Sequence, residues 1–398
     1  MLLAHLLRRA ITQGRLDIID AQGHAHRFGE TKARPDAVLR LHDKGVARAL
    51  VLRPRLAFGE AYMDGRLTIE KGTLAEVLDL LANNADVAGL LPFDRLADHF
   101  AAATRVVHQR NLLSRSAANA AHHYDLSRRL YELFLDPDLQ YSCAYFATPG
   151  LTLEEAQEAK KRLIAAKLCL KPGQSVLDIG CGWGGLALSL ARHAEISVTG
   201  ITLSAQQLTV ARERAEAAGL SHRVRFEMRD YRTMRGSFDR IVSVGMFEHV
   251  GVPHYGDFFQ QVAALLAGDG VALLHAIGRS EGPGTTNPWF RRYIFPGGYS
   301  PALSEVLPAV ETSGLWVTDL EILRLHYAET LKAWRERFAA NRATVADLQG
   351  ERFCRMWEFY LAGAEMSFRR QGHMVFHLQL AKQADAVPRT HDYLRHGR

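Results

Sequence analysis

From about residue 150 to residue 280, hydrophobic and polar positions alternate between strand-like and helix-like patterns. Five short apolar runs are typical of buried strands: SVLDIG (175–180), EISVTGI (195–201), RVRFEM (223–228), FDRIVSV (238–244) and GVALLHAI (270–277). Helical patterns lie before or between most of them, at 152–173, 183–194, 204–219 and 254–268. Strands without polar alternation need cover on both faces, so this order predicts an α/β domain with a parallel sheet.

Local signals mark where several of these helices begin and end. Thr152 with Glu155, and Ser204 with Gln207, have the spacing of capping boxes. Pro172-Gly173 ends the first helix. The run GHMVFHLQLA (372–381) alternates with period two, which predicts a late strand rather than a helix with two metal-binding histidines. We therefore expect no metal site.

The first hundred residues have a less regular pattern. Residues 1–16 form an amphipathic basic helix, which either lies on a membrane or packs on its own domain. The segment 49–70 has strand-like ends around a turn, and 73–87 is helical by period. The basic, poorly patterned segment 104–121 is interpreted as a linker. We predict an N-terminal domain at 1–103 and a second domain at 122–398.

Composition narrows the classes of protein that fit. The chain has 398 residues, 47% apolar and 23% charged, which is ordinary for globular domains but too long for one core. The net charge of +6 suits an anionic partner, either nucleic acid or a phospholipid surface, but also an ordinary solvated surface. The four cysteines lack the spacing of zinc sites or disulfide scaffolds, so we expect reducing cytosol.

The sequence VLDIGCGWGG (176–185) follows a strand and opens a helix, and Gly180, Gly182 and Gly185 match a nucleotide-binding glycine pattern. A dinucleotide site needs an acid about 20 residues later. That window instead contains Thr202, Leu203 and Ser204, followed by Gln207.

The acid lies before the glycines, at Asp178, which is typical of S-adenosylmethionine sites. Asp230 and Tyr231 follow the third strand, where the adenine is expected. This pattern argues against an NAD oxidoreductase and favours a methyltransferase.

Seven ordered motifs resemble the cyclopropane-fatty-acyl-phospholipid synthase family, which is similar to the mycolic acid cyclopropane synthases. They are HHYDLS (122–127), YSCAYF (141–146), VLDIGCGWGG (176–185), GITLS (200–204), FEHVG (247–251), LHAIG (274–278) and YIFPGG (293–298). The resemblance covers roughly residues 105–390 and extends faintly to 59–67. It implies a class I (Rossmann-like) methyltransferase domain with a smaller N-terminal α/β domain.

The resemblance also implies site residues. Tyr141 and Ser142 join the glycine loop around S-adenosylmethionine, with Tyr124 near its amino-acid end. A bicarbonate ion is expected at the reacting centre, among residues that serve catalysis: Cys143, Glu248, His275, the backbone of Ile277, and Tyr327. An alkene attacks a methyl sulfonium without prior deprotonation, and a base must then remove a proton so that the ring closes.

The implied substrate is an unsaturated phospholipid. Loss of the proton from another carbon gives a methylene or methyl-branched chain instead, and this alternative remains open. We expect a cytoplasmic homodimer that contacts the inner face of the membrane transiently, with the N-terminal domain gripping lipid and forming dimer contacts. A nucleic-acid methyltransferase is disfavoured because no basic–aromatic cluster is seen. A non-catalytic lipid-binding protein would leave Asp178, Glu248 and His275 unexplained.

Overall fold

The computed structural model describes residues 2–30, 35–84 and 127–394, and the chain divides into two compact units. The first unit consists of Met1–Arg105, Thr285–Pro296 and Leu331–Gly372. The second consists of Val106–Gly284, Gly297–Thr330 and His373–Arg398. The predicted linker at 104–121 lies outside the described residues, so the domain boundaries stay a prediction.

The N-terminal part of the first unit is a small α/β fold. Its sheet has the order β2-β1-β3-β4, formed by β1 (Arg15–Ile19), β2 (Ala25–Gly29), β3 (Asp36–Leu41) and β4 (Leu67–Lys71). Four helices accompany it: α1 (Leu2–Ala10), α2 (Lys44–Leu52), α3 (Pro54–Met63) and α4 (Leu74–Asn83). Leu3 of α1 is buried in the core of this fold, so α1 packs on its own domain by that face. A small N-terminal α/β domain is confirmed.

The prediction for residues 49–70 was wrong over most of its length. Only β4 is a strand, residues 49–52 and 54–63 belong to α2 and α3, and a turn at 64–66 precedes β4. The physical reason is local capping: the Asp43 side chain accepts a hydrogen bond from the backbone N–H of Val46 at the start of α2. Pro54 then occupies the first turn of α3, where its missing N–H costs nothing.

Helices that are distant in sequence complete the first unit: α13 (Pro288–Tyr293), the part of α15 (His326–Ala340) from residue 331 onward, α16 (Arg342–Gln349) and α17 (Glu351–Arg370). The indole of Trp289 is fully buried, with its ring centroid 4.6 Å from that of Phe359 on α17. Its Nε1 lies 3.2 Å from the Met63 sulfur on α3. Helix α17 also contacts α4, where Arg370 pairs with Asp79 at 2.7 Å. The core of this unit is therefore assembled from separate stretches of chain.

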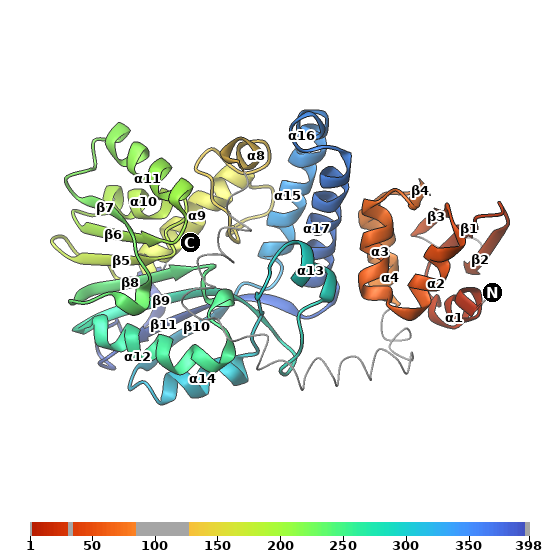
Figure 1. The fold of residues 1–398 in the computed structure, drawn as a ribbon. Coiled ribbons are helices and arrows are strands. Elements are labelled where there is room, and N and C mark those ends of the chain that lie inside the picture. The colour runs from red at the N-terminus through yellow and green to blue at the C-terminus, as the bar shows by residue number, and fades with distance from the viewer. Residues whose placement is uncertain (1, 31–34, 85–126, 395–398) are drawn as a thin grey trace. The chain divides into compact units, whose positions relative to one another are not determined.

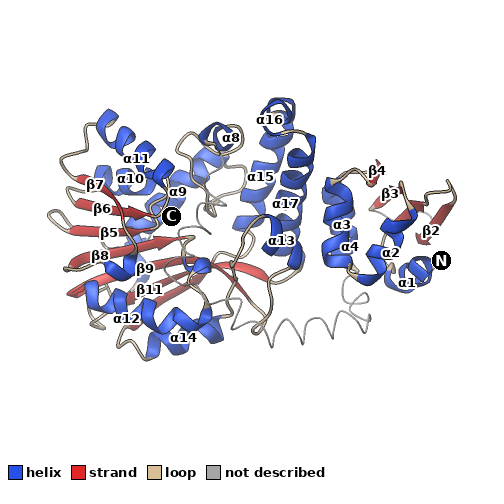
Figure 2. Ribbon diagram, in the orientation of Figure 1, coloured by secondary structure: helices blue, strands red, loops and turns tan. Residues whose placement is uncertain are grey.

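The second unit contains a seven-stranded sheet of order β10-β11-β9-β8-β5-β6-β7 (Figures 1 and 2). Its strands are β5 (Ser175–Ile179), β6 (Ser197–Thr202), β7 (Val224–Met228), β8 (Phe238–Val244), β9 (Leu266–Arg279), β10 (Trp316–Ile322) and β11 (His373–Ala381). Strands β5 to β9 pair in parallel, whereas β11 pairs antiparallel with β9 and with β10. The five predicted strands and the late strand at 372–381 are confirmed.

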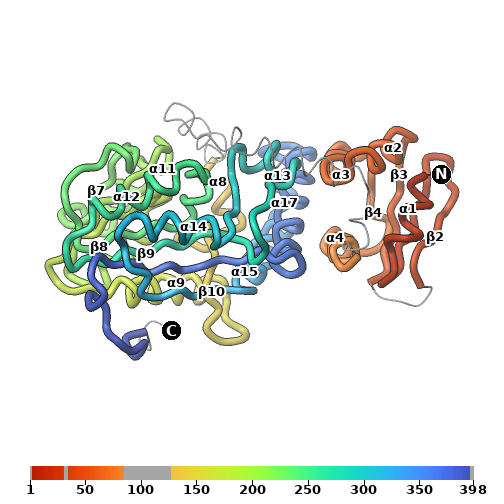
Figure 3. The backbone as a smooth tube through the Cα atoms, turned by 90° about the horizontal axis from the view of Figure 1, so that it is seen from below, coloured from red at the N-terminus to blue at the C-terminus, as the bar shows by residue number. Residues whose placement is uncertain are grey.

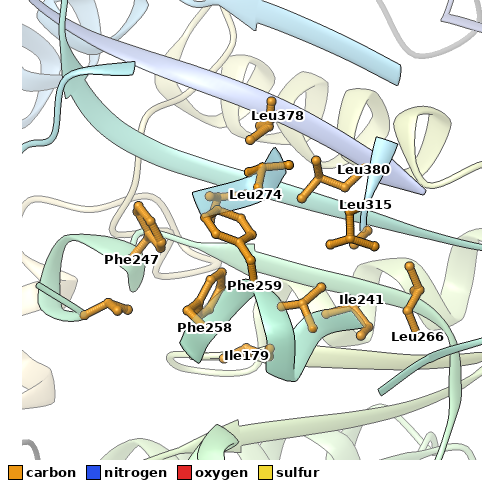
Figure 4. Close-up of a cluster of buried hydrophobic side chains, with 14 of the residues drawn as sticks. Ile179, Ile241, Phe247, Phe258, Phe259, Leu266, Leu274, Leu315, Leu378 and Leu380 are labelled. Carbon is orange, nitrogen blue, oxygen red and sulfur yellow. The ribbon is translucent and has the colours of Figure 1, made fainter. Parts of the chain in front are cut away.

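Helices cover both faces of this sheet. The helices of the unit are α8 (Arg128–Glu132), α9 (Leu153–Lys167), α10 (Gly185–His193), α11 (Ala205–Ala217), α12 (Tyr255–Leu265), α14 (Leu303–Glu311) and the first turn of α15 (His326–Ala340). On β5, Val176 packs with α9, α10 and α11, while Leu177 packs with α12 and α14. Figure 4 shows the second of these cores, where Phe258 and Phe259 of α12 face the strands. The predicted class I (Rossmann-like) α/β fold is confirmed.

Because side chains alternate between the two faces of a strand, the buried polar residues of three strands lie on one face of the sheet. Because Leu177, Leu274 and Leu378 face α12 and α14, their chain neighbours Asp178, His275 and His377 face α9. Strand β11 pairs with β9 and places His377 opposite His275. In Figure 3 this late strand belongs to the blue part of the tube, near the C-terminus. The sheet therefore places three buried titratable side chains under one helix.

Among the described residues, no helix is long and apolar enough to span a bilayer.

Candidate active site

The glycine loop joins β5 to α10. Gly180 and Gly182 have φ angles of 81° and 53°, a region that favours glycine. The backbone N–H groups of Gly180 and Cys181 both donate to the carbonyl of Ile201 on β6, each at 3.0 Å. These bonds tie the loop to the carboxyl ends of two parallel strands, where open α/β sheets bind ligands.

Gly184 and Gly185 serve packing at the start of α10. Gly184, which is not one of the three glycines of the predicted pattern, has φ 82° as the residue before the helix. Gly185 is confined differently, because a Cβ atom there would lie 2.5 Å from Asp138 Oδ2 and from Gln140 Nε2. The third glycine of the motif therefore makes room for the 136–140 loop.

Asp178 lies at the end of β5 and is 1% exposed. Burial raises its pKa to about 7, against the opposing effect of the Lys160 ammonium on α9. Its Oδ2 has no hydrogen-bond partner among the described residues. A buried carboxylate oxygen without a donor fits a ligand that brings an N–H or ammonium group.

Thr202, Ser204 and Gln207 form one buried network at the end of β6 and the start of α11, with Leu203 half-buried between them. The Ser204 side chain accepts from the backbone N–H of Gln207 at 3.3 Å, so the predicted N-cap is confirmed. The predicted capping box is wrong in its second half. The Gln207 Oε1 accepts from the Thr202 hydroxyl at 2.8 Å rather than from the backbone of Ser204.

Asp230 and Tyr231 follow β7. Asp230 caps the short helix η1 (Tyr231–Thr233) and pairs with Arg232 at 2.6 Å, which helps to hold the pKa of its carboxyl below the usual range. The Tyr231 ring packs edge-on against Phe258 with centroids 5.3 Å apart. Tyr124, predicted near the amino-acid end of the cofactor, lies outside the described residues.

The segment Tyr141–Phe146 is held from beneath by α9. Gln157 donates to the carbonyls of Gln140 at 3.3 Å and Ser142 at 3.1 Å. The fully buried ammonium of Lys160 donates to Gln140 Oε1 at 2.6 Å and to the Ser142 hydroxyl at 2.8 Å. Tyr141 packs edge-on against Tyr131 with centroids 5.3 Å apart. Both residues predicted to bind the cofactor here thus sit on a fixed polar support.

Glu248 belongs to η2 (Phe247–His249), just after β8, and is 9% exposed. Its Oε1 accepts from the backbone N–H of Ile277 on β9 at 2.6 Å, while its Oε2 has no partner among the described residues. Burial raises the pKa of the carboxyl to about 7. The structure therefore brings two predicted site residues together, with one carboxylate oxygen left to accept a hydrogen bond from a ligand.

His275 lies two residues before Ile277 on β9 and is 2% exposed. Its Nδ1 is 2.7 Å from Nε2 of His377 on β11. Burial lowers the pKa of His275 to about 3, and the nearby Lys160 charge acts in the same direction. The imidazole is thus neutral near pH 7. His249, to which we assigned no role, is half-buried, and burial lowers its pKa to about 4.

Cys143 and Tyr327 come from two segments that are bonded to each other. The backbone N–H of Ala144 donates to the Thr330 hydroxyl on α15 at 3.0 Å, and that of Phe146 donates to His326 Nδ1 at 3.0 Å. Both predicted site residues are buried. Burial raises the pKa of the Cys143 thiol, which argues against a thiolate nucleophile there.

Lys160 connects these groups of residues electrostatically. Its charge lowers the pKa of Cys143, Asp178 and His275, and burial lowers its own pKa to about 8. Sequence reasoning missed this residue because a lysine in the helical run EEAQEAKKRL is ordinarily solvent-facing. The available signal was its spacing of three from Gln157, which puts two polar side chains on one face of α9. His377 was considered only as a metal ligand.

The sequence and the fold of this chain are similar to those of known proteins. Residues 112–378 match the mycolic acid cyclopropane synthetase family, and residues 3–88 match a domain of unknown function. The cyclopropane-fatty-acyl-phospholipid synthase of Escherichia coli is 40% identical over 337 residues, covering 84% of this chain and 85% of that protein. The tuberculostearic acid methyltransferase of Mycobacterium tuberculosis is 36% identical over 386 residues, covering 92% of this chain and 87% of that protein.

A solved structure extends the similarity to the fold. A mycolic acid cyclopropane synthase complexed with SAH and CTAB superposes with a TM-score of 0.63 and 34% identity, over 66% of this chain and 97% of that chain. That structure contains the demethylated form of S-adenosylmethionine. The likeness therefore supports the cofactor that we inferred from Asp178 and the glycine loop.

Proposed function

This chain belongs to the mycolic acid cyclopropane synthetase family, and from that premise we propose that it acts on lipid alkenes. The enzyme is an S-adenosylmethionine-dependent methyltransferase, as its family and fold establish. The proposed reaction transfers the methyl group to the cis double bond of a phospholipid acyl chain and closes a cyclopropane ring. The observation that carries the proposal is the buried Glu248 carboxylate at the carboxyl ends of β8 and β9. Its Oε1 accepts a hydrogen bond from Ile277, whereas its Oε2 has no partner among the described residues.

The residues present fit the expected bicarbonate ion. The free Glu248 Oε2 suits the hydroxyl of the ion, and a carboxyl pKa raised to about 7 shows that this pocket disfavours an unpaired negative charge. His275 and Tyr327 would hold the remaining oxygens. When bound, the ion supplies the base that accepts the proton lost from the new methyl group.

The structure modifies the expected part of Ile277. Its backbone N–H already donates to Glu248 Oε1, so we assign it the role of orienting that carboxylate. Cys143, with its thiol pKa raised, contributes a neutral S–H rather than a nucleophile. In the proposed reaction, atoms of the chain bind and orient the reacting groups, and no side chain is alkylated.

The proposed reaction is tested by transfer of radiolabel from the methyl group of S-adenosylmethionine to vesicles of an unsaturated phospholipid. We expect label in the lipid, an added mass of one CH₂ group, and loss of the alkene signal. Absence of transfer to lipid would sink the proposal. Glu248→Gln is expected to lower turnover while leaving SAH affinity within about twofold, because the cofactor contacts lie elsewhere.

The second candidate product is a methylene or methyl-branched chain. The specific observation favouring it is the 36% identity with the tuberculostearic acid methyltransferase over 92% of this chain. Proton NMR of the isolated product separates the two, since cyclopropane protons resonate far upfield of vinylidene and methyl-branch protons.

We also propose that the N-terminal domain binds an anionic phospholipid surface. A cavity of about 510 Å³ lies between α1, the 20–22 turn and α2. Apolar residues dominate its lining, and Leu2 and Leu52 at its edge are 63% and 58% exposed. Five exposed cations have no acidic partner among the described residues: Arg8 and Arg9 on α1, Lys44 and Arg48 on α2, and Arg53 just after α2. Exposed leucines on the same helices as cations without acidic partners suit a bilayer with anionic headgroups.

The acids beside this cavity do not cancel those cations. Asp43 is held by Arg66 at 2.7 Å and by the backbone of Val46, and its pKa is lowered to about 2. Asp20 is also engaged, mainly through a hydrogen bond between its Oδ2 and Nε2 of His26 at 3.0 Å. Of the five cations, Lys44 and Arg48 line the cavity.

Vesicle sedimentation with and without phosphatidylglycerol tests this surface. Each cation near an anionic membrane is worth about 1 kcal/mol, so Lys44→Gln with Arg48→Gln should weaken binding by roughly tenfold or more. Arg225→Gln, exposed on β7, is the matched control. Equal binding by the double variant and the wild type would refute the assignment. The expected homodimer is a separate proposal, to be tested by light scattering.

A further inference from the structure

A row of polar side chains crosses three strands on the α9 face of the large sheet. His275 on β9 is paired in register with His377 on β11, which is paired with Glu321 on β10. His377 is completely buried, and its Nε2 lies 2.7 Å from His275 Nδ1. At the far end of the row, Glu321 pairs with the buried ammonium of Lys167 at 2.9 Å. A buried histidine thus supports the imidazole that we place at the reacting centre.

Both imidazoles are neutral in this setting. Burial lowers the pKa of each ring, and the ammonium groups of Lys160 and Lys167 further lower the pKa of His377. A neutral imidazole carries one N–H, and a 2.7 Å contact between two ring nitrogens requires one donor and one acceptor. The pair therefore has two possible arrangements of its protons.

In the first arrangement, His275 Nδ1–H donates to His377 Nε2. The proton of His377 then sits on Nδ1, which is buried without an acceptor among the described residues. Orphaned buried N–H groups are rare in folded proteins. His275 Nε2 would be a bare lone pair, which cannot donate to an anion.

In the second arrangement, His377 Nε2–H donates to His275 Nδ1. His377 Nδ1 is then a lone pair in a region where the nearby lysine charges make lone pairs favourable. His275 carries its proton on Nε2. No buried N–H is wasted within the pair.

We propose that His377 is a positioning residue that donates to His275 Nδ1 and thereby fixes His275 as the Nε2–H tautomer. This inference rests on the proposed function, in which His275 serves the reacting centre. The Nε2–H is then a permanent donor toward an anion or developing negative charge. Because the tautomer is set before substrate binds, the donor needs no proton rearrangement during turnover.

Nitrogen NMR of ¹⁵N-histidine-labelled full-length protein tests the tautomer directly. The His275 signals are assigned from their loss in His275→Gln. We expect the pattern of a neutral Nε2–H ring in the wild type near pH 7. A His275 signal with the proton on Nδ1 would overturn the proposal without any variant of His377.

Variants at position 377 test the positioning role. His377→Gln places an amide N–H donor at the same distance along the side chain and should keep the tautomer and turnover within about threefold. His377→Phe removes the donor and should mix the tautomers and lower turnover about 10- to 100-fold, as loss of an orienting partner typically does. SAH affinity should stay near the wild-type value. His373→Gln, on the same strand and half-buried, is the matched control.

Different results would contradict the positioning role of His377 and the catalytic role of His275. An unchanged His275 tautomer and unchanged turnover in His377→Phe would overturn the positioning role. Normal turnover of His275→Gln, alongside an Nε2–H signal in the wild type, would instead sink the place of His275 in the proposed function. If His377→Phe does not fold, the wild-type spectrum still identifies the tautomer of His275. His377→Gln then shows whether another N–H donor at position 377 keeps that tautomer.

Discussion

Replacing Glu248 with glutamine should make the stability of the protein less sensitive to rising pH. Glu248 is 9% exposed, with one carboxylate oxygen bonded to Ile277 N–H and the other without a partner among the described residues. Burial raises its pKa from 4.5 to about 7. The folded state therefore keeps a proton that the unfolded chain has already released between these two values.

The sign follows from proton linkage. Where the folded state binds more protons than the unfolded state, the free energy of unfolding falls as pH rises. The contribution of Glu248 is thus complete below about pH 4.5, is lost progressively up to about pH 7, and is constant above that. One pKa unit corresponds to about 1.4 kcal/mol, so the whole loss is roughly 3 kcal/mol.

Glutamine cannot titrate, so the variant lacks this loss. Its amide carries a fixed cost for an unpaired buried N–H, but that cost does not depend on pH. The difference in free energy of unfolding, variant minus wild type, should therefore grow by about 2 to 3 kcal/mol between pH 5 and pH 8. The same substitution is expected to lower turnover, which would mean that the site holds a carboxyl that costs stability at neutral pH.

Paired urea unfolding curves at several pH values measure this difference, in buffer free of bicarbonate and cofactor. Contributions common to both proteins, including those of the first compact unit, cancel in the subtraction. Glu213→Gln on the exposed surface of α11 is the control, for which the difference should stay flat. Growth of less than about 0.5 kcal/mol for Glu248→Gln would refute the burial argument.

Three further substitutions probe the supports of the site. Lys160→Met removes the ammonium beneath the Tyr141–Phe146 segment and should weaken SAH binding about tenfold by calorimetry, whereas Arg162→Met, exposed on the same helix, should not. Gly185→Ala forces a Cβ to 2.5 Å from polar atoms and should cost about 1–3 kcal/mol in urea unfolding, unlike Gly256→Ala, which has open space. Lys167→Met removes the buried ammonium that pairs with Asp319 and Glu321 of β10 and should destabilise by about 3–5 kcal/mol, a loss that thermal unfolding would register; an unchanged midpoint would contradict the buried pairing.

The strands and helices around the glycine loop could be predicted from sequence because their determinants are local. Mostly apolar runs of five to seven residues without strict polar alternation, such as β5 and β8, predict strands that are covered on both faces. The capping residues Thr152 and Ser204 act within three positions of themselves. The cofactor class was likewise inferred from the order of residues alone, since Asp178 precedes the glycines and no acid follows β6.

Predictions from short sequence patterns were wrong where the same residues fit two different local structures. The segment 49–70 contains β-branched and apolar residues that suit a strand, but the Asp43 cap and Pro54 begin helices there. Gln207 had the spacing of a capping box, yet its side chain meets Thr202, which a turn of backbone brings closer. In both cases a competing hydrogen bond decided the outcome.

By itself, the sequence determined the order of strands and helices, the cofactor class and the presence of Glu248 after the fourth strand of the large sheet. Only the tertiary structure decided that Lys160 is buried beneath Ser142, that His377 meets His275 across 102 positions of sequence, and that α17 completes the N-terminal unit. The physical reason is the range of the forces. Periodicity and capping act over a few residues, whereas burial and the pairing of polar groups depend on which distant strands and helices the sheet register brings together.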